Sequence, residues 1–171
     1  MYDMTRGMAN GYFDEGTSSE ELKANKQKAR AQIAEERTID YKNGTYAMAG
    51  SVPAKVTLDM PQFVKDYSNF YETKLGYHER SYGSTSGATV TSAATFMNMP
   101  ILSYADEIET PVLMIHGEKA LSRYFSEDAF KKLKGDNKEL YIVPNAVHTN
   151  LYYKMDVIPF DKIETFFEKN L

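Results

Sequence analysis

A chain of 171 residues is long enough for one domain with a hydrophobic core and short for two. Its net charge of −4 disfavours a nucleic-acid-binding protein, because such proteins need a basic face that displaces phosphate counterions. The sequence has no apolar run of about eighteen residues, no signal-peptide pattern and no cysteine, which argues against a membrane span, secretion and disulfides. We therefore expect a cytoplasmic globular protein without nucleic-acid or membrane partners.

Residues 1–102 are predicted to form a largely helical region. A first helix starts at Thr17-Ser18-Ser19, where hydroxyl caps precede two acidic residues and a run of good helix formers. Asp59 is expected to cap a second helix with Pro61 in its first turn, and residues 91–102 form a third. The second helix carries an apolar stripe at helical spacing, which we interpret as core or interface: Phe63, Val64, Tyr67, Phe70 and Tyr71.

Residues 103–171 follow a strand–helix–strand–helix pattern, which predicts an α/β fold with a short parallel sheet. Its strands should be apolar because parallel sheets are covered on both faces. The last helix should turn Ile163, Phe166 and Phe167 inward. The expected elements are a strand at Val112–Ile115, a helix capped at Ser126 and ended by Gly135, a strand at Glu139–Val143 and a helix at Phe160–Leu171.

Two parallel strands do not make a stable sheet by themselves. The sequence therefore predicts a sheet edge that something must cover. A strand from the first part of the chain, a second copy of the chain or a missing segment would each do so. We expect a homo-oligomer or a complementing segment as partner.

His148 is the strongest candidate for chemistry, because it lies in a loop after the second predicted strand, where a general base is held by a rigid scaffold. Glu118 follows the first predicted strand and could orient that imidazole. Either residue could instead be a solvent-exposed loop residue. His116, at the strand end, is expected to pack or form hydrogen bonds, and His78 is expected at the surface.

These residues resemble the C-terminal third of the α/β-hydrolases, closest to the bacterial dienelactone-hydrolase-like group. The resemblance lies in Pro111 before a strand, His116-Gly117-Glu118, the Val-Pro strand end at 143–144 and Val147-His148. The opening MYDMTRGMANGYF is similar to the segment after the sixth strand of that group, ahead of a helical insertion. The resemblance implies that residues 1–171 are a single incomplete domain, with a helical cap-like region at 1–102 and a βαβα segment at 103–171.

The resemblance also implies roles. His148 matches the catalytic histidine of the family. Glu118 substitutes for an aspartate that the family commonly places two or three residues after the strand-end glycine, where this chain has Lys119 and Ala120. The implied reaction is ester, amide or lactone hydrolysis of a small molecule, once the missing N-terminal half completes the enzyme.

The family's nucleophile is missing from this chain. Hydrolases of this type carry G-x-S-x-G at a strand-to-helix elbow. The similar string at 83–87 has Thr85 at its centre and follows no buried strand. The loop that supplies an oxyanion-hole amide is also absent, so we expect the isolated chain to be inactive.

Three hypotheses follow. The first is the C-terminal part of a serine α/β-hydrolase that carries the base and an acid. The second is a non-catalytic, self-associating binding protein on a hydrolase-derived scaffold. The third is a small independent enzyme that uses Ser84 or Ser86 with His148. No cofactor or metal is expected, because the three histidines lack ligand spacing and no glycine-rich phosphate loop follows a strand.

Overall fold

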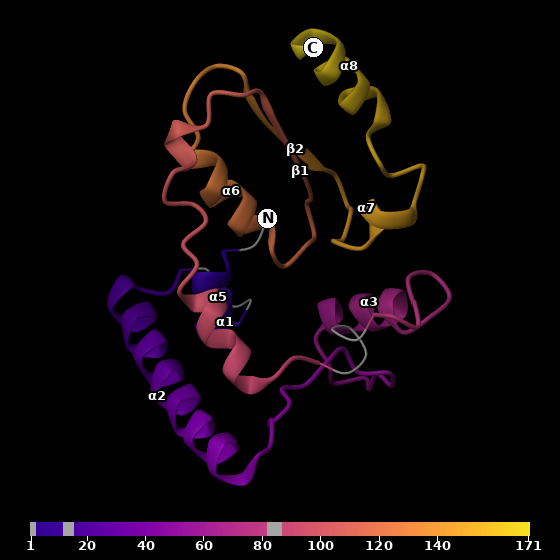
Figure 1. The fold of residues 1–171 in the computed structure, drawn as a ribbon. Coiled ribbons are helices and arrows are strands. Elements are labelled where there is room, and N and C mark those ends of the chain that lie inside the picture. Colours follow the sequence, from indigo (N-terminus) through magenta and orange to yellow (C-terminus); the bar gives the residue numbers. More distant parts are fainter. Residues whose placement is uncertain (1–2, 12–15, 82–86) are drawn as a thin grey trace. The chain divides into compact units, whose positions relative to one another are not determined.

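The computed structural model describes residues 3–11, 16–81 and 87–171 (Figure 1). It divides into two compact units, which we name the helical unit, Met4–Pro100, and the sheet unit, Ile101–Leu171 together with Asp3. The division lies close to Ser103, where the sequence pattern changes. Over the described residues, no helix is long and apolar enough to cross a membrane.

The sheet unit is built on two parallel strands, so the chain has a mixed α/β fold. β1 (Val112–Gly117) and β2 (Lys138–Val143) pair in register from Val112 opposite Lys138 to Gly117 opposite Val143. Both strands and their parallel pairing are confirmed. The remaining elements of this unit are η2 (Ala105–Glu107), α6 (Arg123–Lys132), α7 (Asn150–Tyr153) and α8 (Phe160–Asn170).

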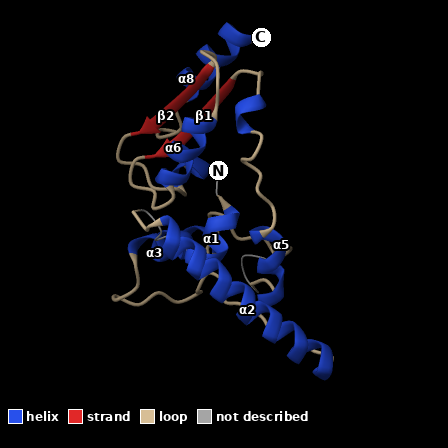
Figure 2. Cartoon of the chain, turned by 90° about the vertical axis from the view of Figure 1, so that its left-hand side faces the viewer, coloured by secondary structure: helices blue, strands red, loops and turns tan. Residues whose placement is uncertain are grey.

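Helices α6 and α8 cover opposite faces of the two strands (Figures 1 and 2). Met114 of β1 lines an apolar cavity together with Ala129 of α6. Glu139 of β2 forms an ion pair with Lys162 of α8. Met114 is in register with Leu140, and successive side chains of a strand point to opposite faces, so these two contacts lie on different faces. The strands are therefore covered on both sides, as a parallel sheet requires.

The structure corrects the predicted start of the helix between the strands. α6 begins at Arg123, and Ser126 lies in its second turn rather than at its cap. Tyr124, Phe125, Ser126 and Ala129 are all buried. The helix ends at Lys132, and Gly135 follows with a φ of 91°, a left-handed conformation that glycine adopts without strain.

The last helix matches its prediction in position but not in its inward face. Phe166 is only 6% exposed, and Ile163 is half-buried. Phe167 is 51% exposed, so the prediction that it points inward is wrong. One face of α8 that includes Phe166 therefore makes the buried contact.

The helical unit is dominated by the long helix α2. The Ser18 hydroxyl accepts a hydrogen bond from the Glu21 amide at 3.2 Å, as an N-cap does, and Gly44 ends the helix with a φ of 64°. α2 extends past the predicted run of helix formers to residue 43. The elements of this unit are α1 (Met4–Asn10), α2 (Ser19–Asn43), α3 (Gln62–Tyr71), η1 (Val90–Ser92) and α5 (Ala93–Met97).

Helix α3 carries the predicted aromatic stripe. Tyr67 lies edge-on to both Phe63 and Tyr71, with ring centroids 5.8 and 6.2 Å apart. The predicted cap is wrong: Pro61 itself occupies the N-cap position, and Asp59 lies before it. The side chain of proline has no oxygen that could accept a hydrogen bond from the amides of the first turn, so the helix starts without a side-chain cap.

The first part of the chain supplies no strand to the sheet over the residues that the structure describes. Its extended pairing is a single antiparallel bridge between Met48 and Thr89. The predicted helix at 91–102 is shorter than expected, since η1 and α5 end at Met97. The described residues of the helical unit therefore contribute no strand to the sheet.

Candidate functional site

The carboxyl ends of β1 and β2 form one edge of the sheet. Gly117 and Val143, the last residues of the two strands, are register partners. Glu118 and the loop at 144–149 therefore leave the sheet side by side, and the Glu118 amide donates to the Val143 carbonyl at 2.9 Å. The parallel pairing brings the predicted base and the predicted acid to the same edge.

The loop that carries the histidine is fixed to the end of β1. The Glu118 carboxylate accepts a hydrogen bond from the Asn145 amide at 2.8 Å, and the Lys119 amide donates to the Ala146 carbonyl at 2.9 Å. Asn145 adopts a φ of 58°, the left-handed conformation that asparagine tolerates best among non-glycine residues. A Cβ at Gly117 would lie 2.4 Å from the Ala146 oxygen, so only glycine allows this close approach.

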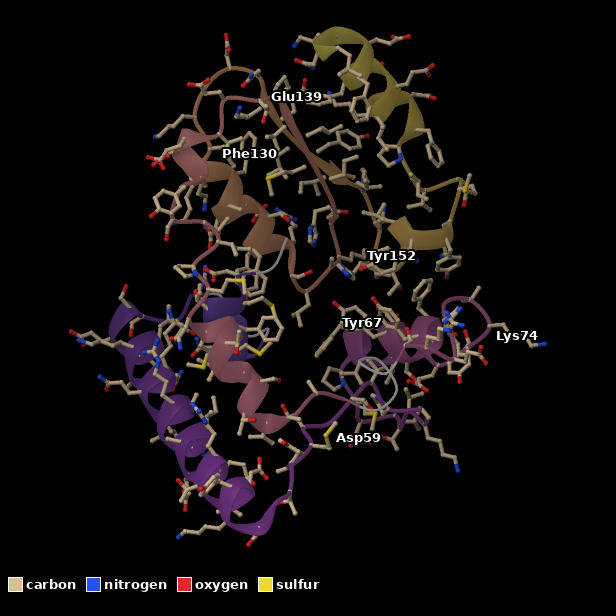
Figure 3. The ribbon with its side chains drawn as sticks, viewed as in Figure 1. Asp59, Tyr67, Lys74, Phe130, Glu139 and Tyr152 are labelled. Atoms are coloured by element: carbon tan, nitrogen blue, oxygen red, sulfur yellow. The ribbon has the colours of Figure 1, made fainter. Side chains whose placement is uncertain are left out.

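His148 is half-buried and hydrogen-bonded to a tyrosine. Its Nε2 lies 2.5 Å from the Tyr152 hydroxyl, and the two rings are edge-on with centroids 5.1 Å apart. Tyr152 belongs to α7, one turn after His148 (Figure 3). Burial lowers the pKa of His148 below its ordinary value of 6.5, which favours the neutral ring. A neutral imidazole is the form that accepts a proton.

His116 forms a second, fully buried polar cluster behind His148. Its Nδ1 lies 2.8 Å from the Ser126 hydroxyl and its Nε2 lies 3.1 Å from the Ser122 hydroxyl. His116 is 4% exposed, and burial lowers its pKa to about 4. The His116 and His148 rings are 5.9 Å apart between centroids. His116 therefore has the hydrogen-bonded, packed role expected for it, as a neutral ring held between two serines.

The sequence analysis missed three of these side chains. The sequence predicts Ser126 as a helix cap, gives no role to Ser122, and indicates for Tyr152 only a tyrosine pair that suits a cleft or an interface. The spacing of four residues between His148 and Tyr152 is a signal that could have found the tyrosine, because such residues face each other on one helical turn. The two serines follow no comparable sequence signal, since they depend on how α6 docks on β1.

Glu118 lies where the sequence placed it, but its observed hydrogen bond goes to the loop backbone. Its predicted contact with the imidazole stays a prediction. His78 is exposed, as expected, and its Nδ1 accepts from the Arg80 amide at 3.1 Å. Ser84, Thr85 and Ser86 lie outside the described residues.

Comparison with known proteins finds a relative that is present both as a sequence and as a solved structure. No family model matches the chain. The chain is 42% identical over its whole length to the uncharacterized protein PA2218 of Pseudomonas aeruginosa, and it spans 44% of that protein's length. The crystal structure of the hypothetical protein PA2218 matches all of this chain with a TM-score of 0.84 and 42% identity, and the match covers 51% of that chain. The fold described above is thus similar to about half of a longer, structurally characterised polypeptide.

Proposed function

We propose that this chain is the base-bearing part of a serine hydrolase of the α/β type, with His148 as the general base. The reaction class is hydrolysis of a small ester, amide or lactone. The observation that carries the proposal is the His148 imidazole, which lies at the carboxyl edge of a parallel sheet and already holds a hydroxyl group on Nε2. That nitrogen is therefore placed to receive a proton from an oxygen nucleophile.

Glu118 acts in this proposal as a positioning residue. Its carboxylate holds the Asn145 amide, and the chain reaches His148 three residues later. The close contact at Gly117 fixes the same loop from the other side. A base must stay within hydrogen-bond reach of the proton that it removes, so a rigid loop supports its function.

In this proposal, the serine nucleophile and the oxyanion-hole amides come from polypeptide outside this chain. The hydroxyl group that is hydrogen-bonded to His148 belongs to Tyr152. A phenol in this place does not replace the serine of a nucleophile elbow. The hydrogen bond between the Tyr152 hydroxyl and His148 Nε2 would have to break when the serine binds to that nitrogen. The length of the Pseudomonas relative, of which this chain matches 44%, leaves room for such a segment.

A hybrid protein tests this proposal. In it, the matched region of the Pseudomonas relative is replaced by this chain, and the product is treated with a fluorophosphonate probe and with p-nitrophenyl esters. We expect one labelled serine outside this chain, ester turnover, and no labelling of the 171-residue chain alone. His148→Gln should lower kcat by about 10²- to 10⁴-fold, the range for loss of a general base.

His78→Gln is the matched control, because His78 is exposed and lies in the helical unit. It should leave kcat unchanged. If neither the hybrid nor the intact relative reacts with the probe, the hydrolase proposal is wrong. Labelling of a serine within the isolated chain would also contradict it and would favour the small-enzyme hypothesis.

A second candidate function is a non-catalytic, self-associating binding protein. One observation favours it: over the described residues, β1 pairs with β2 and with no further strand. Light scattering coupled to size exclusion distinguishes the two functions. A stable dimer of the 171-residue chain together with an unreactive hybrid would support the binding protein.

A further inference from the structure

Asp40 is a buried acidic residue in the last turn of α2 (Figure 1). It is 7% exposed, and its Oδ1 accepts hydrogen bonds from the Ala47 amide at 3.0 Å and the Thr45 hydroxyl at 3.3 Å. Its Oδ2 is also buried and has no hydrogen-bond partner among the described residues. Buried carboxylate oxygens are normally hydrogen-bonded, because their removal from water costs free energy. One oxygen of Asp40 therefore holds the turn after α2, and the other is left to accept a hydrogen bond.

Asp40 lines a cavity within the helical unit. The cavity has a volume of about 390 Å³ and is lined by Arg37, Asp40 and Tyr41 of α2, by residues 44–46 and by Thr91 of η1. A volume of this size is in the range of small-molecule sites. The buried carboxylate therefore belongs to a space that a small ligand could occupy.

Backbone hydrogen bonds hold the walls of this cavity together. The Val90 amide donates to the Ala47 carbonyl at 2.9 Å, and Met48 and Thr89 form the antiparallel bridge. These contacts join the turn after α2 to the start of η1. All of the lining residues belong to the helical unit, so the site needs no residue of the sheet unit.

The cavity has one acidic and one basic side chain, three residues apart on α2. Arg37 and Asp40 have the spacing at which opposite charges on a helix face each other. Nevertheless, they form no ion pair, and the Arg37 guanidinium has no hydrogen-bond partner among the described residues. Both charged groups are therefore available to a ligand that carries the opposite charges.

We propose that this cavity binds an amino acid or a similar small zwitterion, with its ammonium group on Asp40 Oδ2 and its carboxylate on Arg37. An ammonium group donates up to three hydrogen bonds and would supply the partner that the buried oxygen lacks. The negative end of the α2 macrodipole favours a positive charge at the same place. A guanidinium group binds a carboxylate through two parallel hydrogen bonds.

The size and the rim of the cavity fit this class of ligand. An amino acid carries its two charged groups on one carbon atom, which suits two side chains of one helical turn. Tyr41 and Tyr46 are 90% and 78% exposed, so their side chains can change rotamer to admit the ligand. Their rings can also contact its ammonium group. The proposal does not depend on the hydrolase chemistry of His148, which belongs to the sheet unit.

Titration calorimetry of the 171-residue chain with each of the standard amino acids tests the proposal. We expect binding of at least one. Its amide, which lacks the carboxylate, and its N-acetyl derivative, which lacks the ammonium group, should each bind at least about tenfold more weakly. In NMR spectra, the bound amino acid should shift the Ala47 amide, which donates to Asp40. The hybrid protein provides a second measurement in case the 171-residue chain aggregates.

Asp40→Asn tests the acidic half of the site. This change keeps an oxygen for the Ala47 amide and removes the negative charge, so it should raise Kd at least about tenfold. Glu35→Gln is the matched control, because Glu35 is an exposed acid of α2 that does not line the cavity. It should leave Kd unchanged.

Arg37→Gln tests the basic half and should also raise Kd at least about tenfold. Arg37 is exposed, so this variant keeps the proposal testable if Asp40→Asn does not fold. Lys23→Gln removes an exposed positive charge of α2 away from the cavity and should leave Kd unchanged. Circular dichroism checks the fold of each variant.

The proposal is wrong if no standard amino acid binds to the 171-residue chain or to the hybrid, or if the N-acetyl derivative binds as tightly as the free amino acid. Undiminished binding of the amide would assign the site to a simple organic cation and would also overturn it. Equal effects of Asp40→Asn and Glu35→Gln, or of Arg37→Gln and Lys23→Gln, would do the same. An unreactive hybrid that binds the amino acid would refute the hydrolase function and leave this site intact.

Discussion

His116 is the residue whose chemistry is most altered by the fold. Its ring is buried between two serine hydroxyls, and burial lowers its pKa from 6.5 to about 4. The unfolded chain takes up a proton on this ring as the pH falls through about 6.5, whereas the folded chain does so only near pH 4. The neutral ring therefore supports stability fully above pH 6.5, and this support is lost progressively between pH 6.5 and 4.

This linkage gives a prediction for pH-dependent stability. Between pH 7 and pH 5, His116 should lower the free energy of unfolding by about 2 kcal/mol. His116→Gln should be less stable at pH 7, because its side chain cannot bridge both serines in the same way, but it should lack this pH-dependent loss. Urea denaturation at the two pH values measures the effect. His78→Gln should keep the wild-type pH dependence, and an unchanged slope in His116→Gln would contradict the prediction.

Gly117 is a second residue whose side chain is restricted by the fold, because there is no room for a Cβ atom. A methyl group there would lie 2.4 Å from the backbone oxygen of Ala146. Gly117→Ala should therefore displace the histidine loop and lower the free energy of unfolding by about 1–3 kcal/mol, as overpacking does. Thermal denaturation measures the loss. Gly50→Ala is the control, because a Cβ at Gly50 meets nothing within 4 Å, and equal effects of the two changes would contradict the close approach.

Among the elements, α8 packs against the rest of the sheet unit through one of its faces. Phe166 is 6% exposed and Phe167 is 51% exposed, although they are adjacent and chemically identical. Phe166→Ala should lower the free energy of unfolding by about 3–5 kcal/mol, whereas Phe167→Ala should cost less than about 1 kcal/mol. Chemical denaturation of the two variants makes the comparison. Similar losses for both would show that α8 packs on another face.

The elements also show what the sequence could and could not predict. The two strands were predictable, because a continuous apolar run bounded by polar residues is typical of a strand covered on both faces. The start of α6 was not, since Ser126 looks like a cap in sequence while its hydroxyl binds His116 in the fold. Pro61 and Phe167 were misassigned for a similar reason: local patterns rank several helix starts and faces, and tertiary packing chooses among them.

At the scale of the candidate site, the sequence located the edge but not its contacts. His148 and Glu118 follow parallel strands, so their proximity to one edge was predictable. The bond from His148 to Tyr152 depends on the turn of α7, and the bond from Glu118 to Asn145 depends on a left-handed residue. The first bond leaves a trace in the sequence as the spacing of four residues between His148 and Tyr152, whereas the second leaves no comparable trace.

Across the described parts of the molecule, the chain combines a helical unit with a sheet unit that has two paired strands. The sequence predicted that the sheet would need a neighbour, and the described residues do not supply one. Which neighbour is used could not be inferred from residues 1–171, because strand pairing relies on backbone groups that every sequence carries.

The open edge of β1 also bears on how such a chain is made and handled. Backbone amides and carbonyls next to Leu113 and Ile115 attract any extended chain, including those of unrelated or partly folded molecules. A polypeptide with this edge uncovered is therefore exposed to aggregation from synthesis onward. A further strand joined to the sheet unit in one continuous chain would have an effective concentration in the millimolar range. It would therefore cover the edge in preference to unrelated chains.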